Sequence, residues 1–164
     1  MGKETNSVVN ILCSKESPQN HTISLLGILD SDEFEEAFLV MPKLQSLRAH
    51  PIEDIAQWKD FSMQLLESVA FMHSHCIAHM DLTPANILVD VELDDDFQEV
   101  SSRRYCLIDF QLSRFMPSMD AAVLNKWGML DYLAPEVSDK VVYNSFKANV
   151  WAIGEIIKTE GMVD

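Results

Sequence analysis

Basic residues are scarce in this sequence, whose 164 residues include 12 Lys and Arg against 26 Asp and Glu, for a formal net charge of -14 at pH 7. A chain this acidic repels phosphate backbones and anionic membrane surfaces, so neither nucleic acid nor a membrane is expected as a partner. Cysteines are scarce as well, with Cys13, Cys76 and Cys106 at irregular spacing and no CxxC pair. These features exclude a disulfide scaffold and are typical of reduced intracellular thiols.

Long apolar runs are missing too. No stretch reaches the roughly 18 apolar residues of a membrane-spanning helix, and the polar start of the chain is unlike a secretory signal. The protein is therefore expected in the cytoplasm or the nucleus. Hydrophobic residues make up 48% and charged residues 23% of the sequence, a composition typical of one globular domain or a piece of one.

The spacing of apolar residues predicts a helix followed by a β-hairpin in the first part of the chain. Apolar side chains recur at helical intervals from Glu4 to Lys15. Two apolar runs, Ile23 to Leu29 and Ala37 to Met41, then flank an acidic, turn-prone stretch. This order is typical of two antiparallel strands joined by a loop.

The remaining sequence predicts two more helices around a pair of strands. Apolar residues step by three and four from Pro51 to Cys76, which indicates a helix that can break once near Trp58. Two short β-type runs follow, residues 86–90 and 105–109. After a long irregular stretch, the apolar spacing from Phe146 to Ile157 predicts a final helix.

Three short motifs lie between residues 79 and 136. H-M-D-L-T-P-A-N spans residues 79–86 and places a carboxylate, Asp81, and an amide, Asn86, on one tight loop between a helix and a strand. D-F-Q follows at 109–111 and A-P-E at 134–136. In this order the motifs resemble the H-R-D-L-x-x-x-N, D-F-G and A-P-E motifs of the eukaryotic-type protein kinase domain.

The resemblance extends beyond these motifs. Residues 38–44 resemble the kinase strand that runs into the hinge between the lobes, with Met41 as the gatekeeper, and residues 146–154 resemble the start of the large central helix of the C-lobe. By the same register, the predicted helix that begins at Glu4 would be the C-helix. Asn20-His21-Thr22 together with Met41-Pro42 is similar to a fungal group of kinase-like proteins.

This resemblance implies an α+β, protein kinase-like fold in which residues 1–164 form a single partial domain. Residues 1–44 would be an N-lobe remnant of one helix and two antiparallel strands, with the hinge. Residues 45–164 would be a truncated, mainly helical C-lobe.

The function that the resemblance implies is phosphoryl transfer from ATP to a Ser or Thr hydroxyl of a protein substrate, with Mg²⁺. Asp81 would be the catalytic residue that accepts the hydroxyl proton, and Asn86 and Asp109 would hold the metal ions and, through them, the nucleotide. Met41 and Lys43, at the hinge, would contact the nucleotide as well.

Several positions depart from the kinase pattern. An Arg that pairs with phosphorylated loops is replaced by Met80, and a Lys that follows the catalytic Asp is replaced by Thr83. The other replacements are Gln111 for Gly, Met129 for Thr and Asn149 for a buried Asp. An amide at 149 keeps one acceptor oxygen but loses charge assistance, so the catalytic loop is expected to be held less firmly.

Two further kinase features are not found: a G-x-G-x-x-G loop before Glu4 and a V-A-I-K strand. This chain is therefore expected to bind nucleotide weakly and to transfer phosphate at a negligible rate. The alternative function is that of an inactive pseudokinase or gene fragment acting through protein–protein interaction. Apolar faces of the strand from Ile23 to Leu29 and of the helix from Phe146 to Ile157 are expected to be uncovered, so that the chain associates or a protein partner covers them.

Three features allow other interpretations. His73, His75, Cys76 and His79 could form a zinc site, although their spacing matches no standard ligand pattern and His79 fits a packed core position beside Phe110. The acidic run from Glu92 to Glu99 reads as a solvated insertion, since it has neither the spacing nor the glycine of a Ca²⁺ loop. Glu4 could be an ion-pair partner or a polar residue in a frayed first turn.

Overall fold

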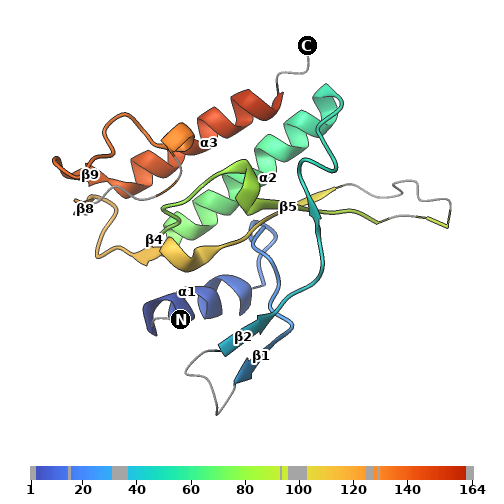
Figure 1. The fold of residues 1–164 in the computed structure, drawn as a ribbon, viewed down its shortest axis with the longest axis horizontal. Coiled ribbons are helices and arrows are strands. Elements are labelled where there is room, and N and C mark those ends of the chain that lie inside the picture. The colour runs from blue at the N-terminus through green and yellow to red at the C-terminus, as the bar shows by residue number, and fades with distance from the viewer. Residues whose placement is uncertain are drawn as a thin grey trace.

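A computed structural model describes residues 3–14, 16–30, 37–92, 94–95, 103–124, 128 and 130–161. Its helices and strands, with the short 3-10 helices labelled η, are α1 (Lys3–Ser14), β1 (Gly27–Asp30), β2 (Ala37–Val40), β3 (Gln45–Ser46), α2 (Ile55–Ser74), β4 (Ile77–Ala78), η1 (Pro84–Asn86), β5 (Ile87–Asp90), β6 (Arg104–Leu107), η2 (Phe110–Leu112), β7 (Arg114–Phe115), β8 (Ala122–Val123), η3 (Leu130–Tyr132), β9 (Tyr143–Asn144) and α3 (Ser145–Gly161). The fold is α+β. In Figure 1, α2 and α3 lie side by side, while α1 and the β1–β2 hairpin lie on the other side of the short strands.

The first helix, α1, is held at its end by the loop that follows it. The carbonyl oxygen of Leu12 accepts hydrogen bonds from Asn20 Nδ2 at 2.6 Å and from Thr22 Oγ1 at 2.9 Å. Such bonds satisfy a carbonyl that has no partner within the helix. Val8 and Leu12 are buried in the main core, and α1 contacts η2 and β7. The predicted helix is thus confirmed, and it packs against the segment that follows Asp109.

The predicted hairpin is confirmed for β1 and β2, which pair antiparallel from Gly27↔Val40 to Asp30↔Ala37. The first strand begins later than its apolar run predicts, because the start of that run bonds elsewhere. Ile23 N–H donates to the Leu107 carbonyl at 3.1 Å, and Leu107 N–H donates to the His21 carbonyl at 2.8 Å. The chain before β1 is therefore bound to the edge of β6.

The long helix α2 begins after Asp54, whose side chain accepts a hydrogen bond from Gln57 N–H at 2.8 Å. This is an ordinary N-cap, and it explains why the helix starts later than Pro51. The helix does not break near Trp58, a break that the sequence left open. Trp58 N–H donates to the Asp54 carbonyl at 2.9 Å, and α2 runs without interruption to Ser74.

A three-stranded antiparallel sheet, in the order β3-β5-β6, covers one side of α2. The ring of Phe61 on α2 packs edge-on against Tyr105 of β6, with centroids 5.0 Å apart. The predicted strands are confirmed, but β6 ends at Leu107, two residues early. The backbone turns there because Asp109 adopts a left-handed conformation with φ 60.

The expectation of uncovered apolar faces is correct for the hairpin, although Ile23 before it is buried, and it is wrong for most of the last helix, where Val150 is exposed. Leu29 and Phe38, which face each other across the hairpin, are 61% and 55% exposed. On α3, by contrast, Phe146, Ile153 and Ile156 are buried, because this face packs against α2 and the loop before β5.

Three sequence interpretations concern parts of the chain that lie outside the described residues. These parts are the side chain of Glu4, the residue Met129 and most of the acidic run from Glu92 to Glu99. Glu92 itself is exposed, as a solvated insertion requires. Among the described residues, no helix has both the length and the apolar character needed to cross a membrane.

One contact between α2 and α3 joins residues far apart in the chain. Trp58 Nε1–H donates to the Ile157 carbonyl at 3.0 Å. The end of α3 is so close that a Cβ added at Gly161 would overlap the Trp58 ring. We predict that Trp58→Phe lowers the free energy of unfolding by about 1–2 kcal/mol, because an aromatic ring stays but its donor is lost. The melting temperature should fall by roughly 2–8 °C.

Gly161→Ala should destabilise the chain through the same contact, since the added methyl group must displace the indole. Lys59→Ala, a change at an exposed neighbour of Trp58, is the control and should leave the melting temperature within about 1 °C. Equal melting of the native chain and Trp58→Phe would show that the Trp58–Ile157 hydrogen bond does not hold the two helices together.

Candidate active site

The loop between β4 and β5 brings Asp81 and Asn86 together. Asn86 Nδ2 donates to the backbone carbonyl of Asp81 at 2.9 Å and to its carboxylate Oδ2 at 3.2 Å. The turn is closed by Asn86 N–H, which donates to the Thr83 carbonyl at 3.0 Å. Pro84 favours this arrangement because it opens η1, at a position where a backbone donor is not needed. The two predicted residues therefore form one hydrogen-bonded unit.

Asp109 lies beside this hydrogen-bonded unit because a backbone hydrogen bond joins the preceding residue to Asn86. Ile108 N–H donates to the Asn86 carbonyl at 3.0 Å, which places the next residue, Asp109, at the same end of the β5–β6 pair. The Asp109 side chain is exposed and accepts a hydrogen bond from Gln111 N–H at 3.4 Å. Its left-handed backbone turns the chain sharply into η2. The structure thus gathers all three predicted residues in one region.

His79 is a structural residue at the centre of this region, as the sequence predicts. Its side chain is completely buried, and its ring lies 5.4 Å from that of Phe110. Its Nε2–H donates to the Ile108 carbonyl at 3.1 Å, while Nδ1 accepts from Asp81 N–H at 3.3 Å. Only the neutral ring can make both bonds. Burial lowers the pKa of His79, in spite of the opposing effects of the Ile108 carbonyl, Asp81 and Asp109.

A cavity of about 650 Å³ opens between α1, the hairpin and the β5–β6 sheet. This volume is within the range of small-molecule sites. Its wall is largely apolar and ends in the candidate metal-binding segment; the lining residues are Val9, Cys13, Ile23, Leu39, Met41, Pro42, Leu88, Ile108, Asp109, Phe110 and Gln111. Met41 lines the cavity, and its contact with a nucleotide stays a prediction. Lys43 is exposed and is not among the lining residues, so its contact with a nucleotide stays a prediction.

Cys13 also lines this cavity, but burial raises the pKa of its thiol to about 11. The thiol therefore stays protonated at neutral pH and is a poor nucleophile. Its contribution to the wall is packing.

The residues present fit a magnesium ion of the kind that is shared with nucleotide phosphates. Mg²⁺ is commonly bound through one or two carboxylates and the phosphates themselves, with waters completing its shell. Asp109 supplies an exposed carboxylate at the cavity rim. Asn86 uses its Nδ2 on Asp81, which leaves Oδ1 as the atom that can ligate a cation.

The zinc interpretation of the histidine cluster finds no support. The described residues contain no group of three His, Cys, Asp or Glu side chains that could hold a metal. Each histidine of the cluster has another partner: His75 Nδ1 lies 2.9 Å from the Phe71 carbonyl, His73 contacts Asn149 and His79 bonds Ile108.

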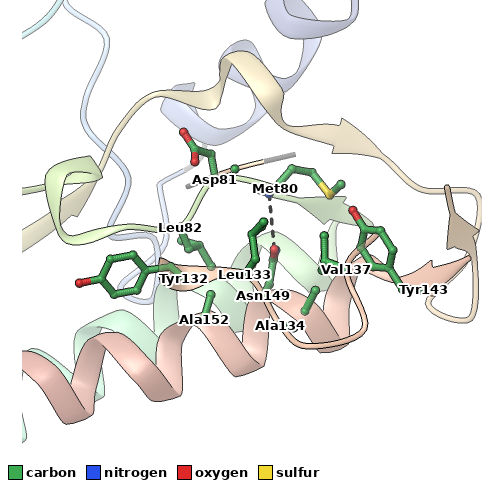
Figure 2. Close-up of a pocket in the computed structure, with 12 residues that line it drawn as sticks. Met80, Asp81, Leu82, Tyr132, Leu133, Ala134, Val137, Tyr143, Asn149 and Ala152 are labelled. Atoms are coloured by element: carbon green, nitrogen blue, oxygen red, sulfur yellow. Dashed lines mark hydrogen bonds between the residues drawn. The ribbon is translucent and has the colours of Figure 1, made fainter. Parts of the chain in front are cut away.

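A second, very small cavity lies between the Asp81 loop and α3 (Figure 2). Its volume of about 20 Å³ is enough for a water molecule and too small for a nucleotide. Leu82 of the loop, Leu133 and Ala152 of α3 line this cavity, and the Asp81 carboxylate points away from α3 (Figure 2). The face of Asp81 that a substrate could reach is therefore the one opposite this helix.

Sequence reasoning missed two contacts that hold the loop. Ser113 Oγ–H donates to the His79 carbonyl at 3.1 Å, and both residues are buried. Gly128, with φ 99, passes so near the loop that a Cβ there would lie 3.0 Å from the Met80 carbonyl oxygen. A glycine beside a functional motif is a signal for such close approach. Ser113 carries no comparable signal in the sequence.

The uncharged residues that stand at these kinase positions are held by packing and by neutral hydrogen bonds. The Met80 side chain packs against two apolar clusters, one containing Phe146 and the other Val137. Thr83 is buried. Asn149 is buried as well, and its Oδ1 accepts a hydrogen bond from Met80 N–H at 3.4 Å. The loop is thus held by neutral groups at positions where kinases, by resemblance, use charged ones.

Comparison with known proteins is consistent with this site. Residues 6–160 match the model of the protein kinase domain. Serine/threonine-protein kinase ppk25 of Schizosaccharomyces pombe is 34% identical over 105 residues, which are 64% of this chain and 22% of that protein. CBL-interacting serine/threonine-protein kinase 2 of Arabidopsis thaliana is 36% identical over 107 residues, 64% of this chain and 21% of that protein.

Serine/threonine-protein kinase ppk27 of Schizosaccharomyces pombe is 29% identical over 99 residues, 57% of this chain and 24% of that protein. The chain therefore spans about a fifth to a quarter of the length of these relatives. The family match covers nearly all of the sequence. With its α+β, kinase-like fold and the ordered motifs that build this site, the chain belongs to the protein kinase domain family.

Proposed function

We propose that the site transfers the γ-phosphoryl group of ATP to a Ser or Thr hydroxyl of a protein substrate. The observation that carries this proposal is the Asp81–Asn86 hydrogen-bonded pair, which a backbone hydrogen bond joins to the segment of Asp109, and Asp109 itself lines a cavity of nucleotide size. The preference for Ser or Thr rests on the relatives, which are named serine/threonine-protein kinases.

In this mechanism the hydroxyl oxygen of the substrate forms a bond to the γ-phosphorus while the bond from that phosphorus to the β–γ bridging oxygen breaks, so that ADP leaves. The hydroxyl proton goes to the Asp81 carboxylate. Asn86 holds Oδ2 of that carboxylate, so Oδ1 is the atom available to the substrate. Asp109 and Asn86 would hold Mg²⁺, which neutralises charge on the phosphates when it is bound.

The apolar wall at Met41, Leu39 and Leu88 suits the flat adenine ring, because such walls remove apolar surface from water on both partners. Asp109, at the rim of the cavity, would hold the metal near the phosphate end of the nucleotide. The neutral residues Thr83, Gln111 and Asn149 supply fewer charges for positioning than the residues they replace, so transfer is expected to be slow in this chain.

A second candidate function is a non-catalytic kinase-like protein that binds other proteins. The exposed apolar side chains of the hairpin favour it, above all Leu29 and Phe38. Adjacent exposed apolar residues on one sheet face are typical of an interaction surface.

The role of Asp81 as the proton acceptor can be tested with radiolabelled ATP, Mg²⁺ and a generic protein substrate. We predict that Asp81→Asn lowers labelling by roughly 100-fold or more, since general-base catalysis contributes about 100- to 10,000-fold. Asp95→Asn, which makes the same change at an exposed carboxylate away from the site, should label like the native chain. Equal labelling by Asp81→Asn and the native chain would rule Asp81 out, and absence of labelling by the native chain would favour the second candidate.

Binding of the metal–nucleotide complex is a separate prediction. Mg-ATP at about ten times its dissociation constant should stabilise the chain by about 1.4 kcal/mol, a rise in melting temperature of roughly 3–6 °C. Asp109→Asn should abolish the part of this rise that depends on Mg²⁺, because it removes the exposed carboxylate at the cavity rim. Asp120→Asn, another exposed carboxylate, is the matched control. A magnesium-dependent rise that survives Asp109→Asn would place the metal elsewhere.

A further inference from the structure

His73, near the end of α2, faces α3. Its ring packs edge-on against Phe146, with centroids 4.7 Å apart, and its Nε2 lies 3.4 Å from Asn149 Nδ2. The amide nitrogen can only donate, so His73 Nε2 must carry a lone pair. Burial alone lowers the pKa of His73 to about 4, which keeps the ring neutral at physiological pH.

The side-chain amide of Asn149 has a donor on one side and an acceptor on the other, and each forms a hydrogen bond. Its Nδ2 donates to His73, and its Oδ1 accepts from Met80 N–H at 3.4 Å, the dashed line in Figure 2. Rotating the amide by half a turn would exchange its donor and acceptor. The Met80 contact therefore requires that the amide nitrogen face His73.

The backbone of Met80 has an unfavourable conformation that a hydrogen bond such as this one can stabilise. Its φ of 70 lies in the left-handed region, which is unfavourable for a side chain as bulky as Met. A residue kept in this region persists only when its surroundings fix it. Because Asp81 is the next residue, a change in the Met80 backbone would turn the Asp81 carboxylate away from Asn86.

We propose that His73 is a positioning residue: its Nε2 lone pair orients the Asn149 amide, which then holds Met80 N–H and with it the backbone that carries Asp81. The effect on catalysis rests on the proposed function, whereas the effect on Met80 does not. The amide is what creates this dependence. A carboxylate at position 149 would offer an acceptor oxygen on both sides and would hold Met80 whatever the state of His73.

Protonation of His73 breaks the arrangement. Its Nε2–H would then face the donor Nδ2 of Asn149, and a rotated amide would turn that donor against Met80 N–H, so one of the two contacts is lost either way. The other titratable side chains near this network have partners of their own: His75 bonds Phe71, His79 bonds Ile108 and Asp81 bonds Asn86. Acid should therefore loosen Met80 through His73.

The test compares three variants: His73→Phe, Asn149→Asp, and the two combined. Hydrogen exchange of the Met80 amide, measured by NMR as a protection factor, reports on the contact directly. We expect His73→Phe to lower Met80 protection about fivefold relative to the rest of α2 and β4, the effect of one hydrogen bond. The combined variant should restore it, because the introduced carboxylate accepts from Met80 without help. His75→Phe, at the C-cap of the same helix, is the control and should leave Met80 protection unchanged.

Two further measurements keep the proposal testable if His73→Phe does not fold. In the native chain, Met80 protection should fall as the pH is lowered towards the His73 pKa of about 4, and should not do so in Asn149→Asp. In Asn149→Asp, the pKa of His73 should rise by about one unit or more, because the carboxylate favours the charged ring. The proposal would be overturned if Met80 protection did not change in His73→Phe. It would also be overturned if this protection were lost equally in His73→Phe and the combined variant.

The outcome for catalysis is separable. If phosphotransfer is present, His73→Phe should lower kcat about fivefold with little change in KM for ATP, and the combined variant should recover it. A chain that transfers no phosphate but whose Met80 responds to His73 would refute the proposed function and leave the positioning role intact. Normal transfer with an unresponsive Met80 would do the reverse.

Discussion

The antiparallel pairing of β5 with β6 is the constraint on which the rest of this structure depends. Its last pair, Ile87↔Leu107, ends the ladder between Asn86 and Ile108, and the 3.0 Å bond from Ile108 N–H to the Asn86 carbonyl continues it into the site. Strand β6 also forms hydrogen bonds with the chain before β1 through Leu107, and it packs on α2 through Tyr105. A slip of one residue would reverse every side chain of β6 and move Asp109 away from Asn86. The register of this pair therefore sets both the core and the site.

Buried hydrogen bonds hold the site in one arrangement in spite of backbone strain. Met80 and Asp109 both have positive φ, a conformation that costs on the order of 1–3 kcal/mol for residues other than glycine. Around them, His79 uses both ring nitrogens and Ser113 donates to the His79 carbonyl. Leaving such a buried group without a partner would cost about 1–3 kcal/mol. Besides Cys76, which follows the end of α2, the described residues other than glycine with positive φ are thus Asp109 and the residue directly before Asp81, where the backbone turns to present the two carboxylates.

Most elements could be predicted from the sequence because their apolar spacing is regular, and Asp81, Asn86 and Asp109 because their spacing follows a known pattern. The predicted start of an element was wrong where a tertiary hydrogen bond or a helix cap competes with the local conformational preference. Ile23 bonds to β6 instead of extending β1, and the N-cap at Asp54 makes α2 begin later than predicted. The burial of the α3 face was missed, since spacing alone does not show that α2 lies against it. Nor could spacing show that His73, on one helix, meets Asn149, on another.

The substitutions that set this chain apart act together. Met80 packs among apolar residues, and Asn149 binds a neutral histidine, so the described interior beneath Asp81 is held without an ion pair. A neutral amide is less costly to bury than a carboxylate, but it keeps Met80 in place only in one of its two orientations. Of the two carboxylates of the site, that of Asp109 is exposed, and that of Asp81 is half-buried and points away from α3. Neutral contacts therefore fix the geometry of the loop from within, and the carboxylates of Asp81 and Asp109 lie outside this neutral network.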